Sequence, residues 1–79
     1  MNKGVIVKEA REALGLTQSE LGARAKVAQS AISAIETGRF GMGVTWARQI
    51  GNALGIEPAD LMDFDEPAAR YVEKGRLDG

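Results

Sequence analysis

Cysteine and histidine are both missing from the 79 residues of this chain. Their absence excludes disulfide bonds, thiol chemistry and zinc sites built from these two side chains. It also removes the most common catalytic base, histidine, and two common nucleophiles, and no other nucleophile–base pair is recognisable in the sequence. An enzyme is therefore the least favoured class of function, and we expect neither a bound metal nor an organic cofactor.

Long hydrophobic runs are missing as well. No apolar stretch is long enough to cross a membrane, and no signal peptide is recognisable, so we expect a cytoplasmic protein with no membrane partner. A chain of 79 residues forms one small domain with a modest core, which oligomerisation commonly supplements.

The chain also lacks a strong net charge, because ten basic and eleven acidic residues leave −1. A charge near zero argues against nucleic acid as a partner, since polyphosphate attracts basic domains. The distribution of charge along the chain removes this objection. Residues 1–48 carry seven basic and four acidic side chains, a net +3, whereas residues 49–79 carry three basic and seven acidic, a net −4. The acidic half is thus set apart from a basic half that suits an anionic partner.

Hydrophobic spacing predicts five short helices joined by tight turns. Their expected ranges are 3–14, 18–25, 28–37, 45–54 and 58–62. The inward residues of the first helix are predicted to be Ile6, Ala10, Ala13 and Leu14. Thr17 and Glu20 form a T-x-x-E capping box, which starts the second helix. Thr45 is expected to cap the fourth helix, and Pro58 suits the first turn of the fifth.

The third predicted helix has an outer face made of small polar side chains. Ile32 and Ile35, three residues apart, set its inward stripe. The residues left pointing outward are Gln29, Ser30, Ser33, Ala34 and Thr37. Such a face is too polar for a core and too uncharged for an ordinary solvated surface. It suits a helix that enters the DNA major groove and hydrogen-bonds to base edges.

The run from Thr17 to Gly38 has the pattern T-Q-x-x-L-x-x-x-A-x-V-x-Q-S-x-I-S-x-I-E-x-G, with twelve fixed positions. It resembles the helix-turn-helix of the lambda-repressor/Cro family of DNA-binding regulators, and the resemblance extends from about Val5 to about Met62. It implies an all-α, five-helix, lambda-repressor-like DNA-binding domain over residues 1–62, with a central helix-turn-helix. Residues 63–79 are then an acidic and mixed C-terminal tail, with a short helix as one alternative and disorder as the other.

The resemblance implies that the third helix reads DNA bases through Gln29, Ser30, Ser33 and Ala34. The amide of Gln29 offers a donor and an acceptor side by side, which matches N6 and N7 of adenine. Gln18 is expected to brace Gln29 and to touch a phosphate. Ser30 is expected to bond to a guanine edge and Ala34 to pack on a thymine methyl group. Ser33 either faces the groove or bonds back to its own helix.

Contacts to the DNA backbone are expected from seven residues around the groove-facing helix: Gln18, Lys26, Arg39, Gly41, Gly43, Thr45 and Arg48. Arg39 is the strongest candidate, because it stands in a glycine-rich loop directly after the third helix. Backbone N–H groups of that loop and of the next helix N-terminus can join it in binding phosphate. The resemblance also implies an ion pair between Arg11 and Glu36, which fixes geometry more than it adds stability.

Three features depart from the family pattern. Lys26 stands where the turn between the two central helices carries glycine, so either a left-handed lysine costs about 1 kcal/mol or the turn has another shape. Ala28 stands where a serine or threonine caps the third helix, which forgoes about 1 kcal/mol. The N-terminal arm is almost absent, with only Lys3 to wrap the DNA. These departures bear on affinity more than on fold.

The expected function is sequence-specific binding of double-stranded DNA by a transcriptional regulator, a small phage or bacterial repressor acting as a homodimer on a palindromic operator. The residues expected to form the dimer contact are Leu61, Met62, Phe64, Tyr71 and Val72. The alternative is a protein-interaction module of the antitoxin-like or antirepressor-binding kind, whose partner is a regulatory protein. The weak net charge and the missing arm favour this alternative modestly.

Overall fold

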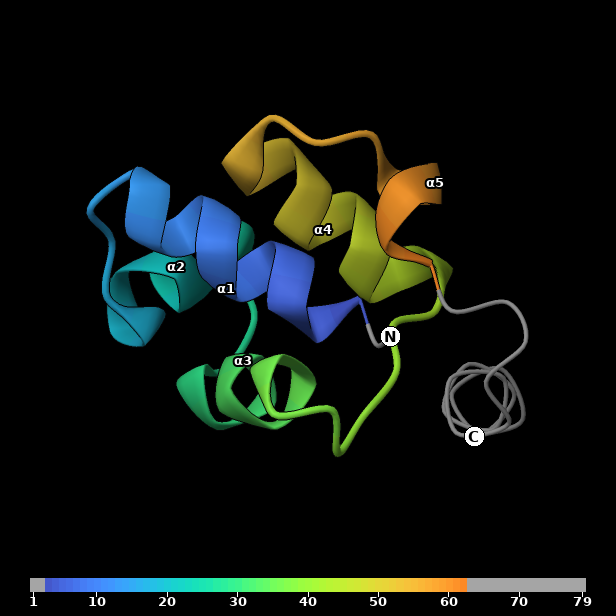
Figure 1. Cartoon of the computed structure of the whole chain (residues 1–79), viewed down its shortest axis with the longest axis horizontal. Coiled ribbons are helices and arrows are strands. Elements are labelled where there is room, and N and C mark those ends of the chain that lie inside the picture. The colour runs from blue at the N-terminus through green and yellow to red at the C-terminus, as the bar shows by residue number, and fades with distance from the viewer. Residues whose placement is uncertain (1–2, 63–79) are drawn as a thin grey trace.

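A computed structural model describes residues 3–62 as five α-helices wrapped around one core (Figure 1). The helices are α1 (Gly4–Ala13), α2 (Gln18–Ala25), α3 (Gln29–Glu36), α4 (Val44–Leu54) and α5 (Pro58–Leu61). These residues form no strand, and the predicted all-α class is confirmed. In the same range, no helix combines the length and the apolar character that crossing a membrane requires.

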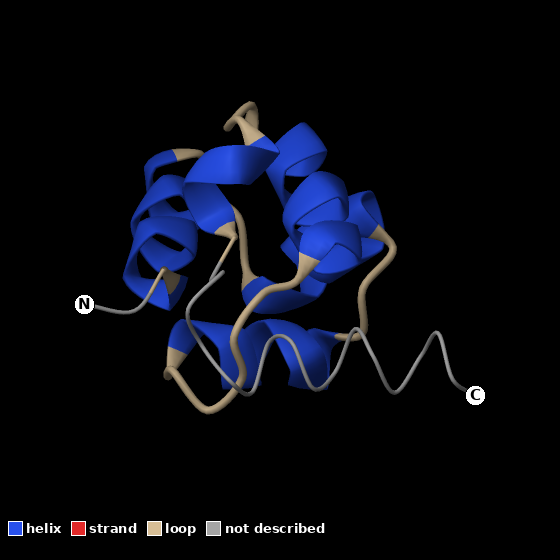
Figure 2. Cartoon of the chain, turned by 90° about the vertical axis from the view of Figure 1, so that its right-hand side faces the viewer, coloured by secondary structure: helices blue, strands red, loops and turns tan. Residues whose placement is uncertain are grey.

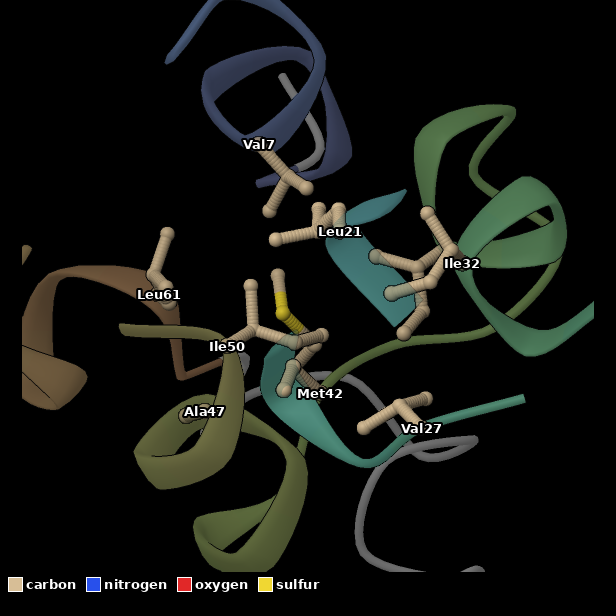
Figure 3. Packing of buried hydrophobic residues seen from close by; sticks show 10 residues of the cluster. Val7, Leu21, Val27, Ile32, Met42, Ala47, Ile50 and Leu61 are labelled. Atoms are coloured by element: carbon tan, nitrogen blue, oxygen red, sulfur yellow. The ribbon is translucent and has the colours of Figure 1, made fainter. Parts of the chain in front are cut away.

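The hydrophobic core receives side chains from all five helices and from two connecting segments (Figure 3). Its buried members are Val7, Leu21, Ala25, Val27, Ile32, Ile35, Met42, Ala47, Ile50 and Leu61. Met42 belongs to the loop between α3 and α4, yet it is only 1% exposed. The loop that follows α3 is therefore anchored in the core, which fixes its path relative to the helix.

All four helix connections share one backbone pattern. In each, an N–H group donates to the carbonyl oxygen five residues earlier: Leu16 to Arg11 at 3.0 Å, Val27 to Gly22 at 2.9 Å, Arg39 to Ala34 at 2.8 Å and Ile56 to Gly51 at 2.9 Å. The residue before each donor is left-handed, with φ of 72° at Gly15, 60° at Lys26, 81° at Gly38 and 75° at Gly55. This arrangement ends each helix, and in every connection except the one after α3 it also turns an apolar residue inward before the next helix begins.

The turns after α2 and α4 bring the next helix very close to the preceding one. A Cβ atom added at Gly22 would lie 2.6 Å from the carbonyl oxygen of Val27, and one at Gly51 would lie 2.5 Å from that of Ile56. No side chain fits at such distances from backbone atoms. Both positions require glycine, and each glycine fixes how two consecutive helices meet.

The inner face of α1 is rotated from the predicted one. Val7 and Arg11 are buried, whereas Ala13 and Leu14, which were predicted to face inward, are exposed. The cause is the ion pair of Arg11 with Glu36, which draws a charged side chain into the interior. A pattern of apolar residues cannot show this, because it assigns charged residues to the surface.

The prediction that Thr45 caps α4 is wrong. The N-cap is Gly43, whose carbonyl oxygen accepts the N–H of Ala47 at 3.0 Å, and Thr45 lies inside the first turn. Gly43 has the extended backbone that an N-cap needs, with φ −84° and ψ −167°. Helix α4 therefore starts one residue before Thr45, and the backbone of the glycine loop leads directly into it.

Leu61 does not belong to a dimer surface, contrary to the prediction. It is 0% exposed and completes the core from α5, so no partner chain can contact it. Met62 is half-buried and packs against the same core. The other residues of the predicted dimer contact, Phe64, Tyr71 and Val72, lie outside the described residues, as does the whole tail, 63–79.

Lys26 is the only residue other than glycine with a left-handed backbone among residues 3–62. This conformation costs about 1–2 kcal/mol for a residue with a Cβ atom. We expect Lys26→Gly to raise the free energy of unfolding by about 0.5–1 kcal/mol, the remainder being offset by the freedom that glycine adds to the unfolded chain. Urea unfolding followed by circular dichroism measures the change. Lys26→Ala is the control, because it removes the same side chain but keeps the strain; an equal gain from both variants would contradict this explanation.

Candidate nucleic-acid interface

Helix α3 lies along one edge of the molecule, with the other helices on one side of it only (Figure 2). Its inner face packs into the core through Ile32 and Ile35. On the opposite face Gln29 and Ser30 are exposed and Ser33 is half-buried. Three of the four predicted base-reading residues thus lie together on an accessible polar surface.

Ala34, the fourth, does not lie on that surface. It is 6% exposed, and its carbonyl oxygen accepts the N–H groups of Arg39 at 2.8 Å and Phe40 at 3.3 Å. The loop after α3 therefore closes on the last turn of the helix. The predicted outward position of Ala34 is wrong, and we leave this residue out of the candidate interface.

A capping box sets the start of α2 as predicted. The N–H of Glu20 donates to Oγ1 of Thr17 at 3.0 Å, and the N–H of Thr17 donates to Oε1 of Glu20 at 2.8 Å. The bond from the Thr17 backbone holds the pKa of the Glu20 carboxyl below its usual range, because it stabilises the ionised form. This stabilisation is present at neutral pH and is lost as the pH falls through the lowered pKa. The box places Gln18 at the first position of the helix.

The N-terminal ends of α2 and α3 are joined by their glutamines. Nε2 of Gln29 donates to Oε1 of Gln18 at 3.1 Å. The bracing role that the resemblance implies for Gln18 thus corresponds to a direct bond. The amide of Gln29 is held at one end and exposed at the other.

Arg11 and Glu36 form the ion pair that the resemblance implies. Nε of Arg11 lies 2.7 Å from Oε2 of Glu36 and its Nη2 lies 3.2 Å from Oε1, with side-chain exposures of 11% and 2%. Arg11 also donates from Nη1 to the carbonyl oxygen of Leu16 at 2.6 Å. The hydrogen bond to Glu36 raises the pKa of the guanidinium. The pair ties α1 to the last residue of α3.

Gln18 connects this ion pair to the exposed face. Its Nε2 donates to Oε1 of Glu36 at 3.1 Å, while its Oε1 accepts from Gln29. One chain of hydrogen bonds therefore runs from Arg11 through Glu36 and Gln18 to Gln29. The resemblance implied the Arg11–Glu36 pair and the Gln18–Gln29 contact separately. The bond between Gln18 and Glu36 was not predicted, because residues 18 positions apart on different helices share no periodic signal.

The residues predicted to contact the DNA backbone come from α2, from the segments on either side of α3 and from α4. Lys26, in the turn before α3, and Arg39, in the loop after it, are both exposed. Arg48 is exposed on α4. The half-buried residues of the set are Gln18, Gly41, Gly43 and Thr45. Exposed positive charge therefore stands three residues before the polar helix and three residues after it in the chain.

Two comparisons of the sequence with known proteins identify the same kind of protein. The sequence model of the family described as helix-turn-helix matches residues 7–61. An HTH-type transcriptional regulator of Methanothermobacter thermautotrophicus is 39% identical over 66 residues, which make up 82% of this chain and 96% of that protein.

Solved structures with a similar fold include the restriction-modification controller protein C.AhdI of Aeromonas hydrophila. It has a TM-score of 0.69 and 28% identity, over 76% of this chain and 91% of that chain. The master regulator for biofilm formation SinR, solved in complex with DNA, has a TM-score of 0.70 and 27% identity, over 77% of this chain and 98% of that chain. These similarities confirm the predicted lambda-repressor-like fold.

Proposed function

We propose that this chain, which belongs to the helix-turn-helix family of DNA-binding transcriptional regulators, binds a palindromic operator as a homodimer and represses transcription there. The observation that carries this proposal is the exposed polar face of α3, where Gln18 holds the amide of Gln29. A primary amide in this position offers a donor and an acceptor to a base edge in the major groove. Ser30 and Ser33 extend the same surface. The similar structure of SinR was solved in complex with DNA, which supports the assignment.

Phosphate contacts are proposed for the positive and backbone donors around α3. They are Lys26, Arg39 and Arg48, joined by Gln18, Thr45 and the N–H groups of Gly41 and Gly43. Such contacts place a protein on the duplex and carry no sequence information by themselves. Base readers and phosphate binders therefore respond differently to a change of DNA sequence, and this difference gives the test.

The test begins with a palindrome selected from a random DNA library by the wild-type chain. We expect Gln29→Ala to weaken binding to this palindrome by about 1–3 kcal/mol per half-site, because a bidentate base contact is lost. Binding to random duplex should barely change. Fluorescence anisotropy titrations of both duplexes measure the two dissociation constants, and equal losses on both would remove Gln29 from base recognition.

Arg39→Ala is the matched control for this measurement. It should weaken binding to the palindrome and to random duplex alike, and reduce the slope of log K against log salt by about 1 per half-site. An unchanged slope would remove Arg39 from the interface. Measured on the same two duplexes, the two variants thus distinguish contacts to the bases from contacts to the DNA phosphates.

A homodimer is proposed because one recognition helix reads too few base pairs to single out a site. Two helices about 34 Å apart reach successive major grooves on one face of the duplex. We propose that Met62 and the tail supply the contact. A chain ending after Met62 keeps Leu61 in the core, so it should fold but bind the palindrome with lower affinity and without cooperativity. Sedimentation and titration test this; undiminished cooperativity would move the contact to Phe40 and Val44, which are 43% and 44% exposed.

A further inference from the structure

The chain of hydrogen bonds from Arg11 to Gln29 has a fixed direction. The carboxylate of Glu36, paired with Arg11 at 2.7 Å, has only acceptor atoms. Gln18 must therefore turn its Nε2 toward Glu36 and its Oε1 toward Gln29, as the bonds of 3.1 Å show. Gln29 then donates through its Nε2, because its carbonyl oxygen in that place would meet another acceptor. The charge of Glu36 thus decides which way the amide of Gln29 faces.

We infer that Glu36 is a positioning residue for base recognition: acting through Gln18, it selects the order in which Gln29 presents its donor and its acceptor to a base pair. This inference rests on the proposed function, in which Gln29 reads a base. The side chain of Glu36 is only 2% exposed, so it acts without touching DNA. Its effect on base choice passes through the two glutamines.

The orientation of the amide matters because base edges present donors and acceptors in a fixed order. With one N–H bonded to Gln18, Gln29 keeps its Oε1 and its second N–H for the DNA. Adenine presents the complementary pair, the N6 donor beside the N7 acceptor. A reversed amide would place acceptor against acceptor and donor against donor at the same base. The direction set by Glu36, and not the presence of glutamine alone, therefore determines the preference for adenine.

The first experiment reverses the amide and measures base preference. Gln18→Lys introduces an ammonium group that can donate both to Glu36 and to the carbonyl oxygen of Gln29. That oxygen would then face the ammonium group and leave the Nε2 of Gln29 outward. The Gln29→Ala variant first identifies the base pair that Gln29 reads in the selected palindrome. The probes are copies of this palindrome in which that base pair is replaced by each of the other base pairs. We expect the ratio of dissociation constants between the changed and the selected duplex to fall about tenfold, the size of one good base contact. The added charge should meanwhile strengthen binding to every duplex.

Ser19→Lys is the matched control for the added charge. Ser19 is exposed and adjacent to Gln18 on α2, and it takes no part in the chain of bonds. This variant should strengthen binding in general but leave the ratio of dissociation constants at the wild-type value. Equal ratios for wild type, Gln18→Lys and Ser19→Lys would overturn the inference, since the direction of the amide would then have no influence on base choice.

The second experiment removes the charge of Glu36 itself. The double variant Arg11→Met with Glu36→Met leaves no unpaired buried charge. Both glutamine amides can then reverse, so the ratio should fall as in Gln18→Lys. Adding Gln18→Glu supplies an acceptor that faces Gln29 again and should restore the ratio, a rescue that a merely structural role of Glu36 would not show.

Circular dichroism melting verifies that each variant is folded. An unchanged ratio in the folded double variant, or no recovery on adding Gln18→Glu, would overturn the inference. If the double variant does not fold, the comparison of Gln18→Lys with Ser19→Lys decides. If the wild-type chain enriches no sequence from the random library, both the proposed function and this inference are overturned. If it enriches a sequence but the ratio of dissociation constants stays unchanged in the variants, only the inference is overturned.

Discussion

Arg11→Met is expected to lower the free energy of unfolding by about 3–5 kcal/mol, because it leaves a buried charge without its partner. The carboxylate of Glu36, with its side chain 2% exposed, would lose the donors at 2.7 and 3.2 Å. The carbonyl oxygen of Leu16 would lose its bond of 2.6 Å to the guanidinium. A small domain has only about 5–15 kcal/mol in total, so the loss is a large part of it. Urea unfolding followed by circular dichroism and by Trp46 fluorescence measures the change.

Two controls identify the cause of this loss. Lys8→Met removes an exposed charge from the same helix and should change the free energy of unfolding by less than about 0.5 kcal/mol. Arg11→Met combined with Glu36→Met removes both charges and should recover most of the stability, since apolar replacements of buried ion pairs are often neutral or stabilising. A loss from Arg11→Met no larger than that from Lys8→Met would contradict the explanation.

The close approach of α2 and α3 gives the second large expected effect. Gly22→Ala should lower the free energy of unfolding by about 1–3 kcal/mol, the usual cost of forcing a methyl group into filled space. The new Cβ would lie 2.6 Å from the carbonyl oxygen of Val27, and a backbone atom cannot move aside without shifting the turn. Because the whole of α3 shifts with the turn, the preference for the selected palindrome should fall more than with Gln29→Ala. Urea unfolding and anisotropy titration measure the two effects.

Gly51→Ala is the matched control within the same chain. Its Cβ would lie 2.5 Å from the carbonyl oxygen of Ile56, so the loss of stability should be similar. The turn that it displaces leads to α5, and the candidate interface on α3 should keep its preference for the palindrome. An equal loss of preference in both variants would show that general destabilisation, and not the position of α3, is the cause.

Local signals were sufficient to predict where two of the helices begin. The capping box of Thr17 and Glu20 gave the first residue of α2, and Pro58 gave that of α5, because both act within one turn of the chain. The inner face of α1 was not predictable in this way, since Arg11 is buried by a partner 25 positions away. The close approach at Gly22 left no trace either, because a glycine within a helix gives no sign of which backbone will pack against it.

Local signals also predicted one part of the candidate interface and missed another. The spacing of Ile32 and Ile35 gives the inner face of α3 and therefore the exposure of Gln29 and Ser30. Ala34 is buried because the following loop returns over the helix, and that path depends on the anchoring of Met42 in the core. Three glycines in this loop indicate a turn, but they do not indicate which residue between them is buried.

The bond between Gln29 and Gln18 also affects the thermodynamics of association. A long side chain that must be immobilised on binding reduces affinity by about 0.5–1.5 kcal/mol in lost rotamer entropy. In this fold the amide of Gln29 is already held at 3.1 Å before any DNA is present, so much of that entropy is lost during folding. In the proposed complex, the free energy of the base contact of Gln29 is then available for affinity. Preorganisation of this exposed side chain by a buried ion pair would let a small domain recognise DNA with few contacts.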